Sequence, residues 1–201
     1  MENTENKILG NLLVTPVINK SLLKISSETG LSYVTVHKTV PALLKQKLVK
    51  QETKGHSNLI SIDFENSSLG RLSSAIALEK FRIFNQYPLL ELISNDIEEV
   101  LADFFYSLIL FGSFVNGSPS KDSDVDLLLI IPERKVRDIY AKKINSLHHS
   151  IKKDIIIISS QDFNEMLEQK NTVGRAAFNA GIVLFGADHY YSLVKKYVRS
   201  N

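Results

Sequence analysis

The sequence has no cysteine among its 201 residues, so disulfides and thiolate metal sites are excluded. Apolar runs are also short. The longest surround residues 104–111 and 155–158, far below the roughly 20 residues that a helix needs to cross a bilayer. The first six residues lack the basic and apolar segments of a secretory signal. We therefore expect a cytoplasmic protein with no membrane segment.

Neither sign of charge dominates, because 24 lysines and arginines face 22 aspartates and glutamates for a net charge of +2. The length and the 44% hydrophobic content are typical of a globular chain with one large domain or two small ones. The basic excess is local: residues 18–56 contain seven lysines and two glutamates. This excess favours a polyanionic partner, although a solvated lysine-rich face would give the same pattern.

Residues 1–65 have the pattern of a small helical domain that ends in a hairpin. Helical periodicity covers residues 7–14, 22–29 and 32–48, and strand-like pieces at 49–52 and 59–62 enclose a turn. Gly30 suits the end of the second helix, and Ser32 suits the start of the third. Three helices and a hairpin predict a winged helix-turn-helix domain over residues 1–65.

The stretch from Gly30 to Val36 resembles the turn and recognition helix of winged helix-turn-helix regulators. The resemblance implies binding to double-stranded DNA, with outward-facing contacts from the third helix and from the wing tip. The expected contact residues are Thr35, Lys38, Lys45, Lys54 and His56. Two departures are Pro41, which should kink the helix, and Lys47, where glycine often precedes the wing. A winged helix used for protein contact is the alternative.

The rest of the chain is expected to continue with a linker helix over residues 66–87, with possible homodimerisation through residues 67–88. An α/β domain should then occupy residues 88–201. Its expected elements are helices at 89–104, 133–149, 162–170 and 173–180, strands at 106–111, 125–131, 154–158 and 182–185, and a last helix to Val198. The predicted fold class is therefore α+β, with a winged helix-turn-helix, a helical linker and a mixed sheet.

Three aspartates lie where two of these strands begin. Asp124 and Asp126 share one face of a strand because side chains alternate with a period of two. Asp154 opens the next apolar strand and can reach the same place. Such carboxylates repel each other unless a cation lies between them, and Mg²⁺ or Mn²⁺ with the phosphates of an NTP suits that role.

Gly112 and Ser113 follow an earlier strand, where the missing Cβ of glycine would let a phosphate approach the backbone. If a helix begins there, its free N–H groups favour an anion.

Together, Gly112-Ser113, Asp124-Val125-Asp126 and Asp154 resemble the motifs of the DNA polymerase β-like nucleotidyltransferase superfamily, most closely its minimal antitoxin-type members. The resemblance covers roughly residues 88–201. It implies a mixed-sheet nucleotidyltransferase fold in which the three aspartates bind two metal ions and are catalytic. Gly112, Ser113 and also Ser123 would contact the triphosphate. Many minimal members carry arginine where this chain has Asn116, which predicts a weaker phosphate or substrate contact.

Three functions remain open on this basis. The first is transfer of a nucleoside monophosphate from an NTP to an acceptor hydroxyl. The second is a DNA-bound regulator that senses NTP without turning it over. The third is a DNA-binding antitoxin that masks a toxin partner. For the enzyme, a short domain with little chain to enclose a small substrate favours a hydroxyl on a protein partner as acceptor, and the antitoxin resemblance favours a toxin-like protein.

Overall fold

The computed structural model describes residues 3–55, 57–120, 123–147 and 152–200 as a mixture of helices and mixed sheets. The chain divides into two compact units, Met1–Glu79 with Val194–Asn201, and Lys80–Leu193. The divisions fall inside helix α4 (Leu69–Gln86) and helix α9 (Ala187–Ser200), so each of these helices contributes to both units. No helix in the described part of the chain is long and apolar enough to cross a membrane.

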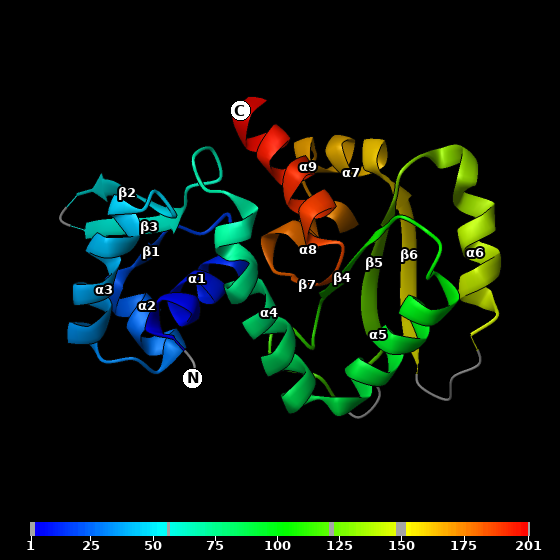
Figure 1. The fold of residues 1–201 in the computed structure, drawn as a ribbon, viewed down its shortest axis with the longest axis horizontal. Helices are drawn as coiled ribbons and strands as arrows, with labels where there is room; N and C mark the ends of the chain where they lie inside the picture. The colour runs from blue at the N-terminus through cyan, green and yellow to red at the C-terminus, as the bar shows by residue number, and fades with distance from the viewer. Residues whose placement is uncertain (1–2, 56, 121–122, 148–151, 201) are drawn as a thin grey trace. The chain divides into compact units, whose positions relative to one another are not determined.

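The N-terminal unit begins with three helices and a three-stranded antiparallel sheet in the order β1-β3-β2 (Figure 1). The elements are α1 (Thr4–Val14), β1 (Lys20–Ser21), α2 (Leu22–Thr29), α3 (Tyr33–Lys45), β2 (Val49–Lys54) and β3 (Ser57–Ile62). The three expected helices and the expected hairpin are present. Strand β1 was not expected, because two residues are too few to show an alternating pattern.

Capping residues determine where the helices of this unit begin and end. The side chains of Ser21 and Ser32 accept hydrogen bonds from the first turns of α2 and α3, and Gly30 ends α2 with φ 69°. Helix α3 continues through Pro41 but ends at Lys45, three residues earlier than predicted. The reason lies at Lys47, whose φ of 55° is left-handed and incompatible with a continuing helix.

The second unit is built on a four-stranded sheet in the order β6-β5-β4-β7, whose strands lie side by side in Figure 1. Strands β5 and β6 are parallel, and the other neighbours are antiparallel. The elements are α5 (Pro88–Val100), β4 (Ser107–Phe111), β5 (Val125–Ile131), the 3₁₀ turn η1 (Arg134–Val136), α6 (Arg137–Asn145), β6 (Lys153–Ser159), α7 (Ser160–Glu168), α8 (Val173–Asn179) and β7 (Ile182–Phe185).

Several predicted boundaries in this unit were wrong. The predicted 133–149 helix is a 3₁₀ turn followed by α6, which ends at Asn145; residues 148–149 lie outside the described residues. Helix α7 starts earlier than predicted, because Ser159 and Asp162 form a reciprocal capping box. Helix α5 ends at Val100 rather than Phe104.

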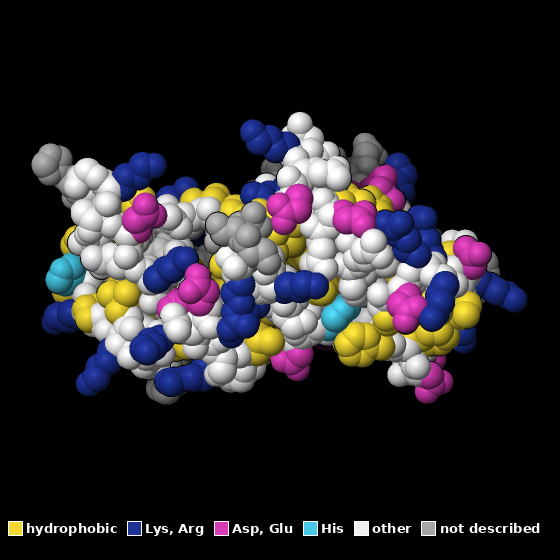
Figure 2. All heavy atoms as spheres, turned by 90° about the horizontal axis from the view of Figure 1, so that it is seen from above, with side chains coloured by type: hydrophobic (Ala, Val, Ile, Leu, Met, Phe, Trp, Pro, Cys, Tyr) yellow, Lys and Arg dark blue, Asp and Glu magenta, His cyan; other side chains and the backbone are white. Residues whose placement is uncertain are grey.

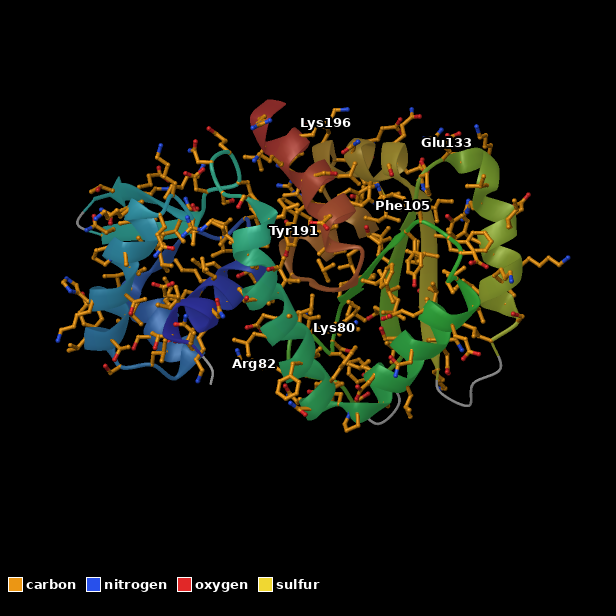
Figure 3. The ribbon with its side chains drawn as sticks, in the orientation of Figure 1. Lys80, Arg82, Phe105, Glu133, Tyr191 and Lys196 are labelled. Atoms are coloured by element: carbon orange, nitrogen blue, oxygen red, sulfur yellow. The ribbon has the colours of Figure 1, made fainter. Side chains whose placement is uncertain are left out.

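The inner strands form the core of the second unit, since four of the five residues of β4 and six of the seven of β5 are buried. Burial of the aliphatic side chains among them contributes roughly 1.5–3 kcal/mol each. Polar contacts fix the surrounding helices. The Tyr140 hydroxyl of α6 donates to the carbonyl of Phe105 at 2.8 Å, and Lys80 of α4 forms an ion pair with Glu98 of α5 at 3.2 Å (Phe105 and Lys80 are labelled in Figure 3).

Candidate active site

Asp126 occupies the centre of the candidate site, in an inner strand of the sheet. The register places it opposite Phe111 of β4 on one side and opposite Asp154 of β6 on the other. Residues directly opposite each other carry their side chains on the same face of a sheet. The structure therefore brings together Asp126 and Asp154, as the sequence predicts.

Asp124 immediately precedes β5 and is two residues from Asp126, so their side chains share a face. Asp124 and Asp154 are exposed, whereas Asp126 is only partly so. Burial, followed by the negative charges of Asp154 and Asp124, raises the pKa of Asp126, and a backbone hydrogen bond from Ser113 opposes this shift. The three carboxylates thus interact electrostatically at one end of the sheet.

Gly112 bends the chain at the end of β4 and lies against Asp126. Its φ of 75° is left-handed, and a Cβ added at this position would collide with the Asp126 carboxylate. Both observations require glycine here. The sequence explains the glycine by the close approach of a phosphate. The structure adds a second explanation, because the missing Cβ leaves room for the Asp126 carboxylate.

Residues 112–117 form consecutive turns rather than the start of a helix. The Asn116 N–H donates to the Gly112 carbonyl at 3.1 Å, and the Ser118 N–H donates to the Ser113 carbonyl at 3.0 Å. The helix that the sequence analysis considered after Gly112 is thus not formed, and no helix dipole acts on residues 112–117. The Ser113 N–H contacts a carboxylate instead.

Phe114 holds this turn in place, and the sequence analysis missed it. Its side chain is 6% exposed and packs edge-on against Tyr87, with ring centroids 5.1 Å apart. A lone aromatic residue within a Gly/Ser-rich loop was the only available signal. Phe114 is a positioning residue for Gly112 and Ser113, because it ties their turn to the helices of the same unit.

Ser123 lies just before Asp124, where the resemblance places a triphosphate contact. Its hydroxyl accepts from the Ser120 N–H at 2.8 Å and lies 3.0 Å from the Ser120 hydroxyl. The Ser123 N–H in turn donates to the Ser120 carbonyl. These bonds give Ser123 a structural role at the foot of the loop. Asn116, in the position where arginine was considered, is exposed.

The donor set suits a hard divalent cation, because it consists of carboxylate oxygens, and burial together with the charges of Asp154 and Asp124 raises the pKa of Asp126. Within the described residues, however, no three acidic or histidine side chains converge closely enough to form a complete cation site. The protein ligands are therefore insufficient alone. Phosphate oxygens of a bound nucleotide would have to supply the remaining ligands.

The predicted DNA-contacting residues lie in the N-terminal unit. Lys38 and Lys45 on α3 and Lys54 at the end of β2 are exposed. Thr35 is partly buried, and its hydroxyl lies 2.8 Å from that of the capping Ser32. His56 lies outside the described residues. The exposed surface of α3 also includes Tyr33 and His37, whose rings are 6.0 Å apart and which the sequence analysis did not single out.

Not all lysines behind the local basic excess reach the surface. Lys20 is 3% exposed, and its ammonium group donates to Glu28 at 2.7 Å and to two oxygens of Asn11. Burial lowers the pKa of Lys20, and the Glu28 hydrogen bond opposes this shift. Lys24 also pairs with Glu28, at 3.9 Å. The surface excess is therefore smaller than the sequence suggests, although basic side chains stand out on the N-terminal unit in Figure 2.

The second unit contains a region that is similar to known proteins. Residues 94–184 match the nucleotidyltransferase domain family. A Methanocaldococcus jannaschii protein, provisionally named a protein adenylyltransferase, is 36% identical over 64 residues, which are 31% of this chain and 65% of that protein. The match thus spans less than two thirds of the relative. These similarities support a nucleotidyltransferase, and the matched residues 94–184 contain all three aspartates.

One solved structure, of a toxin–antitoxin with AMP-PNP, contains a chain with a TM-score of 0.35 and 20% sequence identity. The similarity covers 53% of the present chain and 86% of that chain.

Proposed function

We propose that this chain transfers a nucleoside monophosphate from an NTP to a hydroxyl group of a protein partner, in a metal-dependent reaction. The observation that carries the proposal is the register pairing of Asp126 with Asp154 beside Asp124, in a region that matches the nucleotidyltransferase domain family. The proposed catalytic residues are these three aspartates. Mg²⁺ or Mn²⁺ held between them and the triphosphate would neutralise charge on the phosphates.

In this proposal each group of site residues has a separate role. The turn at Gly112 and Ser113 would hold the triphosphate beside β5. Asp154, the exposed carboxylate on the outer strand, would accept the proton of the attacking hydroxyl. The acceptor oxygen forms a bond to the α-phosphorus, the bond from that phosphorus to its bridging oxygen breaks, and pyrophosphate leaves.

The exposure of the site favours a macromolecular acceptor. Asp124 and Asp154 lie on the surface, whereas small-molecule sites usually bury most of their ligand. A protein acceptor can complete such a site with its own surface. The name of the M. jannaschii relative, a protein adenylyltransferase, agrees with this choice.

Labelled NTP, Mg²⁺ and cell extract test the proposal. We expect a labelled protein band with the unaltered chain and at least a hundredfold less label with Asp154→Ala or Asp126→Asn, the scale on which a general base or a charge-stabilising group acts. Asp103→Asn, which changes an exposed aspartate in a turn outside the motif, is the matched control. Label found only in a small molecule would contradict the protein acceptor.

The N-terminal unit supports a second part of the proposal. Its order of helices and strands, α1-β1-α2-α3-β2-β3, supports the winged helix-turn-helix that the sequence predicts. We propose that α3 enters the major groove of double-stranded DNA and that Lys54 at the wing contacts the neighbouring backbone. Transfer would thus be coupled to DNA binding.

Two observations favour a rival function. Asn116 replaces the expected arginine, and the described carboxylates do not converge into a complete cation site. An inactive domain that senses NTP, or an antitoxin that only masks its partner, would tolerate both features. Tight NTP binding in calorimetry without transfer to any acceptor would identify the sensor.

A further inference from the structure

Strand β6 is an outer strand of the four-stranded sheet, with β5 on one side. The Val125 N–H donates to the Lys152 carbonyl at 3.0 Å, which fixes the alternation of the main chain along β6. In a parallel ladder, every second residue directs its N–H and C=O toward the neighbouring strand. The main-chain groups of Asp154 and Ile156 therefore face β5, and those of Lys153, Ile155 and Ile157 point away from it.

These outward groups offer a place for another strand. In the part of the chain that the structure describes, no hydrogen bond reaches the outward N–H or C=O groups of Lys153, Ile155 or Ile157. Proteins usually protect such an edge with a bulge, a proline or a short strand. Strand β6 has seven residues in unbroken register with β5, and Ile155 and Ile156 are only partly buried.

The same strand carries Asp154, which links the open edge to the chemistry. We propose that the acceptor protein docks through an extended segment that adds to the outer edge of β6 and places its hydroxyl residue opposite Asp154. Directly opposed residues on neighbouring strands have Cα atoms about 4.5–5.5 Å apart and side chains on one face. The acceptor hydroxyl would therefore reach the Asp154 carboxylate. This inference rests on the proposed function and names its substrate class.

The opposite face of β6 determines which acceptors fit. The residues that flank the hydroxyl residue would lie opposite Lys153 and Ile155, with side chains on the face away from Asp154. An open hollow of about 400 Å³ is lined by Ile144, Asn145, Leu147, Lys152, Lys153 and Ile155, of which Lys153 and Ile155 lie on that face of β6. Two lysines in this lining favour acidic flanking residues. The acceptor segment is therefore an extended peptide with a hydroxyl residue between acidic neighbours.

Amide hydrogen exchange by NMR tests the docking without catalysis. The probe is a seven-residue peptide with phenylalanine, which lacks the hydroxyl of tyrosine, at the acceptor position and glutamate on both sides, added to the full chain without NTP. We expect at least tenfold slower exchange of the Lys153, Ile155 and Ile157 amides. Unchanged exchange at peptide saturation would overturn the inference. Slow exchange before any peptide is added, together with a dimer in sedimentation, would overturn it in favour of edge pairing between two copies.

Transfer to tyrosine peptides provides the second test. Glutamate-flanked peptide should exceed lysine-flanked peptide in kcat/KM by roughly fivefold or more, and Lys153→Glu should reverse this order. Ile155→Pro removes one outward N–H and should lower transfer roughly fivefold while NTP binding stays unchanged, with Ile155→Val as the matched control. Transfer indifferent to both changes would overturn the docking. Absence of transfer to every acceptor would instead refute the proposed function, and the exchange experiment would still test the edge.

Discussion

Asp126 and Asp154 lie directly opposite each other on two parallel strands, although 27 residues separate them in the sequence. The pairing sets two negative charges on one face of the sheet, with Asp124 close by, and burial together with these neighbouring charges raises the pKa of Asp126. An arrangement that opposes its own ionisation costs stability unless a ligand relieves it. In the proposed function, the relationship would link the stability of the domain to the binding of cations and nucleotides.

The first prediction is that Asp126→Asn stabilises the domain at neutral pH in buffer with EDTA. Burial and the two neighbouring aspartates raise the pKa of Asp126 above its unfolded value of about 3.9, so the folded state binds the proton more tightly. The resulting penalty is absent below the unfolded pKa and becomes complete as the pH rises through the folded pKa. Thermal unfolding from pH 3 to pH 8 should show a gain that vanishes at the acid end. A gain independent of pH would contradict this cause.

The second prediction compares two glycines in one turn. Gly112 and Gly117 have φ values of 75° and 72°, but only at Gly112 would a Cβ meet Asp126; at Gly117 nothing lies within 4 Å. Each change to alanine should cost about 1–2 kcal/mol for the left-handed backbone. Gly112→Ala should cost more in chemical denaturation and should also weaken NTP binding, whereas Gly117→Ala should leave NTP binding nearly unchanged. Equal effects of the two substitutions on stability and on NTP binding would contradict a special role of Gly112.

The motif of the candidate site was predictable because its signals are local. Alternation places Asp124 and Asp126 on one face, and an aspartate heading an apolar run marks the start of a strand. The register of Asp154 with Asp126 needed one assumption, that β6 lies beside β5, and the structure confirms it.

Other features depend on contacts that the sequence does not display. The collision between a Cβ at Gly112 and Asp126, the packing of Phe114 on Tyr87 and the burial of Lys20 each join residues from separate elements. Lys20 in particular counted toward a basic surface, yet its ammonium group is enclosed by Asn11 and Glu28. Spacing alone cannot distinguish an exposed lysine from a buried one.

The third prediction concerns Lys47, which holds a left-handed φ of 55° at the point where glycine was expected. Lys47→Gly should stabilise the N-terminal unit by about 0.5–1 kcal/mol, because glycine adopts this conformation without the steric cost. Lys50→Gly, on the exposed part of β2, is the matched control and should destabilise by a similar amount. Denaturant unfolding of both variants measures the difference, and a loss of stability with Lys47→Gly would contradict the backbone argument.

The fourth prediction concerns the aromatic anchor of the turn. Phe114→Ala should lower the free energy of unfolding by about 3–5 kcal/mol, since it leaves a cavity beside Tyr87. Phe81→Ala changes the same residue type at a site that is 63% exposed and should cost far less. If Phe114 also positions the triphosphate turn, a Phe114→Leu variant that folds should raise the dissociation constant for NTP. Unaltered NTP affinity in that variant would reduce Phe114 to a purely structural role.

The last prediction tests the proposed DNA surface by its salt dependence. A lysine that contacts a phosphate releases a counterion, so its removal should reduce the slope of log K against log salt by roughly one unit. Lys38, Lys45 and Lys54 are exposed on α3 and β2, and each change to alanine in the full chain should reduce the slope by that amount. Lys170→Ala, at an exposed position in the other unit, should leave the slope unchanged.

Lys20→Ala is a second control, which removes a positive charge that is not on the surface. The Lys20 ammonium group is enclosed by Asn11 and Glu28, so the variant should lose stability while its folded fraction keeps the full slope. Equal slopes for all five proteins would show that α3 does not contact the DNA backbone and would favour a protein partner for the N-terminal unit.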